Sequence, residues 1–144
     1  MTAASHGARI WQLSRILNDC LSKALQPIVK RYGITQQQAQ LLFSVYKNKA
    51  TTVGTLAARL GLARTNASSM CKKLSNMGFL KRLRREDDER IVSVSLTKIG
   101  EDAALAIESR IRQVYVENYI NMEEVDKMVE SFSSLSTRLT EDDE

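Results

Sequence analysis

Apolar residues recur every three or four positions along most of this 144-residue chain, the spacing that places them on one face of an α-helix. The pattern predicts helices over residues 8–32, 35–46, 52–60, 63–77, 97–114 and 121–139. The chain holds only one Pro and six Gly, so few positions break a helix or force a tight turn. Pro27 lies inside the first of these helices and is expected to bend or break it. The sequence therefore predicts a mainly α-helical protein.

Two short predicted helices lie on either side of Gly61, a residue suited to the left-handed conformation that ends a helix. The second of them, residues 63–77, has an apolar stripe at helical spacing, formed by Ala67, Met70, Cys71, Leu74 and Met77. We expect that stripe to face the core, which leaves the polar and basic residues of the helix facing outward. Two short helices with a Gly-containing turn between them are typical of a helix-turn-helix.

A β-hairpin is predicted directly after these two helices. Residues 79–84 and 91–96 are the expected strands, because Val92, Val94 and Leu96 alternate with serines in the second one. Between them, residues 85–90 form an exposed and charged tip. A helix-turn-helix followed by a β-hairpin is a winged helix, so the predicted fold class is mainly α with a small β-hairpin wing.

The outer helices of the chain carry more apolar surface than a winged helix can bury. We expect residues 1–32 and 99–144 to provide N- and C-terminal dimerisation helices, and residues 33–98 to form the winged helix-turn-helix, all in one integrated domain. The predicted assembly is therefore a homodimer.

Charge is distributed unevenly along the chain. Residues 59–90 hold nine basic and four acidic side chains, whereas residues 121–144 hold eight acidic and two basic ones. A concentration of positive charge on a helix-turn-helix is typical of a surface that binds nucleic acid. The alternative is a winged helix used as a protein-interaction module without DNA readout, for which an apolar or acidic outer face on helix 63–77 is expected.

Other classes of protein find little support in the sequence. No stretch approaches the ~18 apolar residues of a membrane span, and the N-terminus lacks the layout of a signal peptide, so a cytoplasmic protein without membrane contact is expected. Cys20, Cys71 and the lone His6 are too few and too scattered for a metal site or a disulfide framework, and no cofactor is expected. Without a candidate base, phosphate loop or carboxylate pair, the chain is not expected to be an enzyme.

The strongest motif lies across the wing. Asp88-Glu89-Arg90, followed by Leu96-Thr97-Lys98-Ile99-Gly100, resembles the pattern D-x-R-x5-L-T-x-x-G of the MarR family of bacterial regulators. Residues 61–66, 74 and 78–80 are similar to that family's recognition helix and the strand after it, and the resemblance runs from about residue 8 to residue 139. It implies a homodimeric transcriptional regulator, expected to be a repressor, that binds a palindromic double-stranded DNA operator. It also implies release from DNA by a small-molecule effector or an oxidant.

The predicted DNA contacts lie on the outer face of helix 63–77 and in the wing. Base edges in the major groove are expected to meet Thr65, Ser69 and Lys72, and phosphates to meet Arg64, Ser68, Lys73 and Asn76, with Asn66 on the same surface. In the wing, Arg84 and Arg85 complete this set, Arg90 is expected to enter the minor groove, and Asp88 to orient the wing arginines.

Two features of this predicted surface depart from the family's pattern. Ala63 stands where a capping residue is usual, so the start of the recognition helix is expected to be less well anchored. The acidic residues of the wing tip are expected to repel phosphates unless they point away or pair with Arg84 and Arg85.

Overall fold

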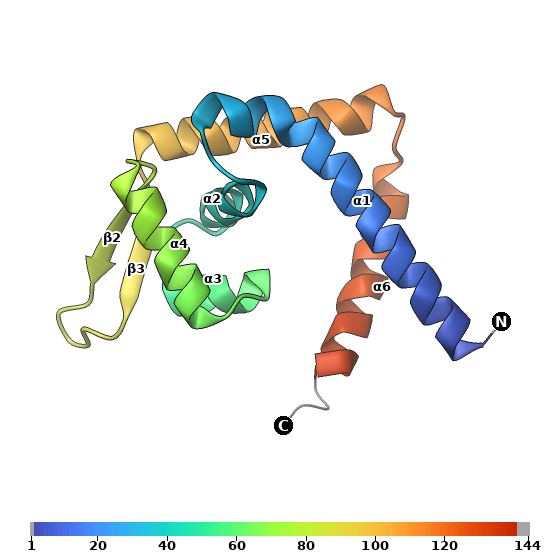
Figure 1. Cartoon of the computed structure of the whole chain (residues 1–144), viewed down its shortest axis with the longest axis horizontal. Coiled ribbons are helices and arrows are strands. Elements are labelled where there is room, and N and C mark those ends of the chain that lie inside the picture. Colours follow the sequence, from blue (N-terminus) through green and yellow to red (C-terminus); the bar gives the residue numbers. More distant parts are fainter. Residues whose placement is uncertain (1, 141–144) are drawn as a thin grey trace. The chain divides into compact units, whose positions relative to one another are not determined.

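The structure is a computed structural model that describes residues 2–140. Its elements follow the order α1 (Ala3–Tyr32), α2 (Gln36–Asn48), β1 (Thr51–Thr52), α3 (Val53–Leu60), α4 (Arg64–Asn76), β2 (Leu80–Arg84), β3 (Val92–Leu96), α5 (Lys98–Glu117) and α6 (Met122–Thr140) (Figure 1). The prediction of a mainly helical protein with a β-hairpin wing is confirmed. The acidic residues 141–144, which contribute to the predicted negative charge of the C-terminal part, lie outside the described residues.

The chain forms two compact units, one up to Ile111 and one from Arg112 onward. The first unit contains the hydrophobic core, whose most fully buried large side chains come from α2, α3, α4, β3 and α5: Leu41, Leu42, Val45, Leu56, Cys71, Leu74, Val94 and Ile107. The helix-turn-helix and the hairpin therefore share one core. In the second unit, α6 has no buried residue among those described.

A capping box begins α2. The Thr35 hydroxyl accepts the backbone N–H of Gln38 at 3.1 Å, and the Gln38 side-chain oxygen accepts the backbone N–H of Thr35 at 2.9 Å. Two backbone donors at the helix end are thus satisfied by two side chains. Gln38 is buried, and this hydrogen bond also offsets the free-energy cost of moving its polar side chain out of water.

The hairpin belongs to a three-stranded antiparallel sheet of order β1-β3-β2. β2 pairs with β3 along its full length, from Leu80 opposite Leu96 to Arg84 opposite Val92. The sequence did not predict β1, which lies around the start of the predicted helix 52–60. β1 pairs Thr51 with Val94 and Thr52 with Ser93, while the Thr52 hydroxyl also accepts the N–H of Thr55 and caps α3.

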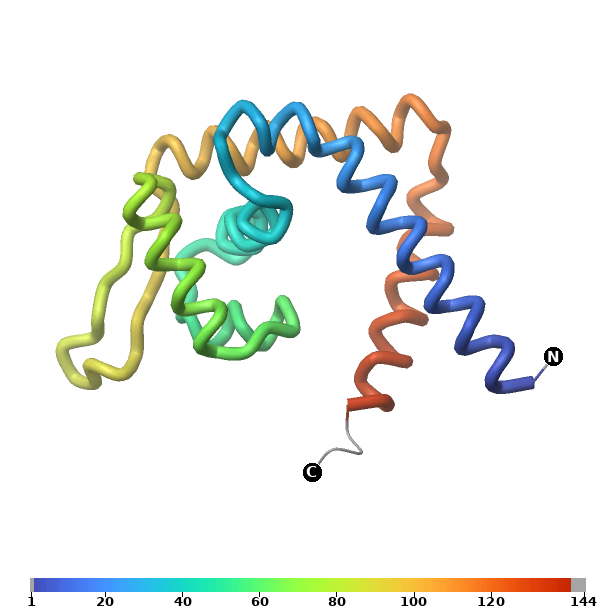
Figure 2. The backbone as a smooth tube through the Cα atoms, viewed as in Figure 1, coloured from blue at the N-terminus to red at the C-terminus, as the bar shows by residue number. Residues whose placement is uncertain are grey.

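Pro27 does not break α1, which is a single helix from Ala3 to Tyr32. Figure 2 shows that this helix is continuous but changes direction between its N-terminal part and the part that runs along α5. Of the two predicted outcomes, a broken helix is therefore wrong. α1 ends at Gly33, whose φ of 64° is left-handed.

Most of the apolar face of α1 is exposed in the single chain. Leu25 is buried and Ile28 and Val29 are half-buried, so the C-terminal part of the helix packs on the core. The N-terminal part instead exposes a run of large apolar side chains: Ile10, Trp11, Leu13, Ile16, Leu17 and Leu21.

Candidate nucleic-acid interface

The turn before α4 fixes how this helix is presented. α3 ends at Gly61, whose φ of 62° is left-handed, as its position in the sequence predicts. Ala63 then has the extended backbone of an N-cap residue but makes no side-chain hydrogen bond to the helix. The first N–H groups of α4 thus lack the side-chain acceptor that Ser, Thr, Asp or Asn would provide.

The apolar stripe of α4 determines which side of the helix faces outward. Ala67, Cys71 and Leu74 are fully buried, and Met70 packs partly buried against them. Met77 is an exception, since 39% of it is exposed, and its prediction as a core residue is wrong. It lies after the last residue of α4 as the C-cap, where the chain turns toward Gly78 and no longer follows the helical stripe.

The opposite face of α4 carries the side chains that the sequence predicts as DNA contacts. Arg64, Thr65, Asn66, Ser69, Lys72, Lys73 and Asn76 are exposed, and Ser68 is half-buried. No acidic residue occurs in α4. The face is therefore polar and positively charged, which favours an anionic partner over an apolar one.

The wing tip holds its charged residues in short-range pairs. The carboxylate of Asp88 accepts the backbone N–H of Arg90 at 3.0 Å and lies 3.5 Å from the Nε of the same residue. At the other side of the tip, Arg85 Nε lies 3.1 Å from an oxygen of Asp87. These pairs are exposed and contribute little stability. They do place an acidic group next to each of two wing arginines.

A hollow of about 490 Å³ lies between α4 and the wing. It is lined by Arg64, Ser68, Lys72, Arg82, Arg84, Glu89, Arg90 and Val92. The Nη2 of Arg64 donates to the backbone oxygen of Arg90 at 3.4 Å, so the start of α4 contacts the wing tip directly. Five cationic side chains and one carboxylate surround this hollow, so its lining carries a net positive charge.

Sequence reasoning missed Arg82 and Glu89 as members of this site. Strand parity identifies Arg82, because alternate residues of β2 point to the same side and Arg82 therefore shares a side with Leu80 and Arg84. Glu89 carries no such signal, since it lies in the tip, where no regular alternation applies.

A second hollow, of about 360 Å³, lies on the other side of α4, against the start of α2. Its lining residues are Thr35, Gln37, Gln38, Leu62, Asn66, Ser69, Met70 and Lys73. The two hollows divide the predicted contacts of α4, with Ser68 and Lys72 in one and Ser69 and Lys73 in the other. Gln37 was not predicted as part of the site.

Cys71 lies beneath the outward face of α4 and is completely buried. Burial raises the pKa of its thiol above the ordinary value, and the nearby positive charge of Arg82 acts in the opposite direction. The thiol is therefore neutral at physiological pH and packs as a small core side chain. Cys20, in contrast, is exposed on α1.

The second half of the wing motif has a structural task. Thr97 Oγ1 donates to the backbone oxygen of Gly78 at 2.5 Å and accepts the N–H of Gly100 at 3.2 Å. A Cβ atom on Gly100 would lie 2.1 Å from the backbone oxygen of Phe79. The Leu96–Gly100 part of the motif thus joins the sheet closely to α5, while the Asp88–Arg90 part shapes the wing tip.

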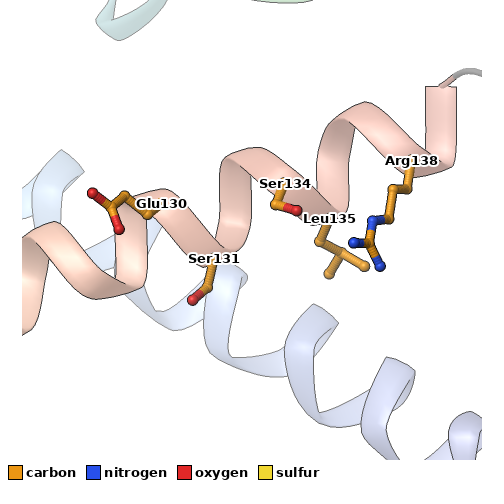
Figure 3. A pocket seen from close by; sticks show the side chains of 5 residues that line it. All are labelled: Glu130, Ser131, Ser134, Leu135 and Arg138. Atoms are coloured by element: carbon orange, nitrogen blue, oxygen red, sulfur yellow. The ribbon is translucent and has the colours of Figure 1, made fainter.

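The second unit has a hollow of about 450 Å³ along one side of α6. Ser131, Leu135 and Arg138 project from the same side of the helix there, with Glu130 and Ser134 beside them (Figure 3). Elsewhere on α6, apolar side chains such as Met128, Val129 and Phe132 are exposed. Within residues 2–140, no helix is long and apolar enough to cross a membrane.

Comparisons with known proteins agree with this architecture. A family model described as transcriptional regulator SarA/Rot matches residues 23–107. The regulator SarZ of Staphylococcus epidermidis is 27% identical over 110 residues, which cover 76% of this chain and 74% of SarZ. Reduced AbfR bound to DNA superposes with a TM-score of 0.78 at 19% identity, covering 94% of this chain and 95% of AbfR.

A mutant of MarR from E. coli, complexed with operator DNA, superposes with a TM-score of 0.71 at 19% identity, covering 94% of this chain and 99% of MarR. At such identities the two structural likenesses show the winged-helix fold. The family model covers more than half of the chain and includes all of α2, α3, α4 and the wing. The chain therefore belongs to the SarA/Rot family of transcriptional regulators, and its wing motif resembles that of the MarR family.

Proposed function

We propose that this protein is a sequence-specific regulator of transcription, expected to be a repressor, that binds double-stranded DNA as a homodimer. One observation carries the proposal: α4 and the wing border a common hollow with five cationic side chains and one carboxylate. Duplex DNA carries a regular array of negatively charged phosphates. An exposed helix flanked by cations is therefore a better match for DNA than for an apolar or basic protein surface.

In the proposed complex, α4 lies in the major groove and the wing lies over the neighbouring minor groove. Thr65, Ser69 and Lys72 meet base edges and give sequence preference. The remaining cations of α4 meet phosphates and set the register. Arg90 enters the minor groove, where a narrow groove concentrates negative potential.

The proposed dimer brings two DNA-binding lobes, each formed by residues 33–98 of one chain, to a palindromic operator. The N-terminal part of α1 exposes large apolar side chains, including Leu13 and Leu17, and α6 exposes Met128 and Phe132. An apolar surface of this kind is unfavourable in water and is typical of a protein–protein interface. Residues 1–32 and 99–144 are the segments to which we assign dimerisation, and residues 33–98 those to which we assign DNA binding.

In this role the protein binds DNA and catalyses no reaction. Its proposed location is the cytoplasm, where the bacterial chromosome lies. A small-molecule effector would act by favouring a spacing of the two lobes that does not fit the operator.

The test is binding of the purified chain to genomic DNA fragments in gel shifts at a series of salt concentrations. The proposal expects selective retention of some fragments, with the logarithm of affinity falling linearly with the logarithm of salt by about 0.9 per phosphate contacted. Light scattering on the same sample should give the mass of a dimer. Absence of salt-sensitive DNA binding would favour the protein-interaction module, and a strict monomer would contradict the palindromic site.

A further inference from the structure

Arg82 occupies an unusual position in the first hollow. It lies in the middle of β2 and is paired with Val94 of β3, a fully buried residue. On the same side of the strand, Leu80 is buried and Arg84 is exposed. Arg82 is partly buried between them, at the point where the core gives way to the hollow.

The guanidinium of Arg82 has a donor atom that no described residue satisfies. Its Nε is buried and has no hydrogen-bond partner among residues 2–140. Its positive charge acts on the thiol of Cys71, but a neutral thiol cannot serve as a counter-ion. The wing arginines Arg85 and Arg90 differ in both respects, since they are exposed and each has an aspartate beside it. Leaving a buried charged donor unpaired is costly in a folded protein.

The other groups around the hollow increase this excess of positive charge. Arg64, Lys72, Arg84 and Arg90 line it together with Arg82, against the single carboxylate of Glu89. A phosphate group carries negative charge and several acceptor oxygens, so it offers what these donors lack. The hollow also lies between α4 and the wing, which are the two elements proposed to contact DNA.

We infer that Arg82 binds a phosphate of the DNA backbone at the floor of this hollow, between the groove occupied by α4 and the groove reached by the wing. This inference rests on the proposed function. Arg82 is a positioning contact in this account, because a phosphate carries no base identity. The Arg82–phosphate contact fixes where α4 and the wing lie along the duplex.

The experiment compares Arg82→Gln with Lys81→Gln as a matched control. Lys81 is the neighbouring residue on β2, is exposed and lies on the opposite side of the strand, so both variants lose one positive charge. DNA affinity is measured at several salt concentrations for an operator and for an unrelated duplex. Arg82→Gln should weaken both by roughly tenfold and reduce the salt slope by about 1, while Lys81→Gln changes affinity and slope much less.

Thermal unfolding without DNA separates binding from a structural role. Because its buried Nε has no partner, loss of Arg82 should leave the Tm unchanged or raise it. A lower Tm together with weaker DNA binding would make Arg82 a structural residue and overturn the inference. Wild-type affinity and salt slope in Arg82→Gln would overturn it as well.

A further experiment uses inorganic phosphate to distinguish a DNA phosphate from a free phosphate ion as the partner of Arg82. If phosphate raises the Tm of the wild type through Arg82, and Arg82→Gln leaves DNA binding intact, the hollow binds a free anion and the DNA assignment is wrong. If the wild type shows no salt-sensitive DNA binding at all, the proposed function itself fails. That outcome differs from a failure confined to Arg82.

Discussion

Arg110 on α5 donates a hydrogen bond from its Nε to the backbone oxygen of Ala24 on α1, at a distance of 3.0 Å. The contact is partly buried and joins residues 86 positions apart. Proline has no N–H, so Pro27 leaves the carbonyl of Lys23 without its helical donor. Ala24 is the next residue along α1, and the bond from Arg110 adds a charged donor to its carbonyl. The bond therefore joins α5 to α1 beside the position that Pro27 weakens.

Arg110→Ala should destabilise the first unit, because the carbonyl of Ala24 loses its charged donor and α5 loses a bond to α1. We expect the free energy of unfolding to fall by about 1–2 kcal/mol in urea titrations at fixed protein concentration. Arg59→Ala removes the same kind of side chain from an exposed position on α3 and serves as the control. Equal stability of the two variants would show that the Ala24 contact contributes nothing.

Arg90→Ala should weaken operator binding by about 1–3 kcal/mol and lower the salt slope, since it removes the proposed minor-groove contact. Asp88→Ala should also weaken binding, because the Asp88 carboxylate holds both the backbone N–H and the Nε of Arg90. The double-mutant cycle distinguishes orientation from charge. Asp88→Ala should have little effect once Arg90 is absent, and fully additive losses would contradict an orienting role for Asp88.

Ala63→Ser should stabilise the protein by about 0.5–1 kcal/mol, measured as an increase in the free energy of unfolding. Ala63 already has the backbone conformation of an N-cap, and its side chain offers no acceptor to the free N–H groups of α4. A serine hydroxyl can provide one without moving the helix. The matched control is Ala63→Val, which has no oxygen, and an equal gain in that variant would rule out capping as the cause.

Gly100→Ala should destabilise the fold by about 3 kcal/mol, because its Cβ would lie 2.1 Å from the backbone oxygen of Phe79. Gly54→Ala is the control, since a Cβ there meets no atom within 4 Å and alanine favours the helix. The second variant should be as stable as the wild type or slightly more so. A well-folded Gly100→Ala protein of normal Tm would show that α5 and the sheet can separate.

The Cys71 thiol should be unreactive in the native protein and should make stability depend on alkaline pH. Burial raises its pKa, so the unfolded chain loses this proton at a lower pH than the folded protein. Stability from this group is complete below the ordinary thiol pKa and decreases as pH rises from there through the raised value. Cys71→Ala should lack this component in unfolding curves measured across that range.

Thiol labelling checks the same point in a Cys20→Ser background. Cys71 should then react with a thiol reagent only at the rate at which the protein opens. Rapid labelling under native conditions would mean that the thiol is accessible.

The outward face of α4 could be predicted because its stripe of Ala67, Cys71 and Leu74 follows helical spacing so strictly. The wing strands were predicted within one residue for a similar reason, since valines and serines alternate there. β1 was missed because two threonines show no periodicity, and their pairing with Val94 and Ser93 depends on residues some forty positions away. Long-range pairing is not visible in a short window of sequence.

The site itself was predicted only as far as helical periodicity reaches. Exposed residues of α4 follow from the stripe that is buried, whereas Arg82 is partly buried and belongs to a hollow formed by two elements. Its role in that hollow depends on how close the wing lies to α4. That distance is set by tertiary packing, including the contact of Arg64 with the wing tip, and no local pattern encodes it.

Thr52 has consequences for how target preference can change. It pairs with the wing through Ser93 and also caps α3, so a single residue ties the hairpin to the helix-turn-helix. The helix-turn-helix and the wing are thereby held at a constant distance from each other. A shift to operators with differently spaced half-sites would then require a change in how two such lobes are joined. Exchanging residues 51–96 between related proteins should correspondingly transfer base preference while leaving half-site spacing with the recipient.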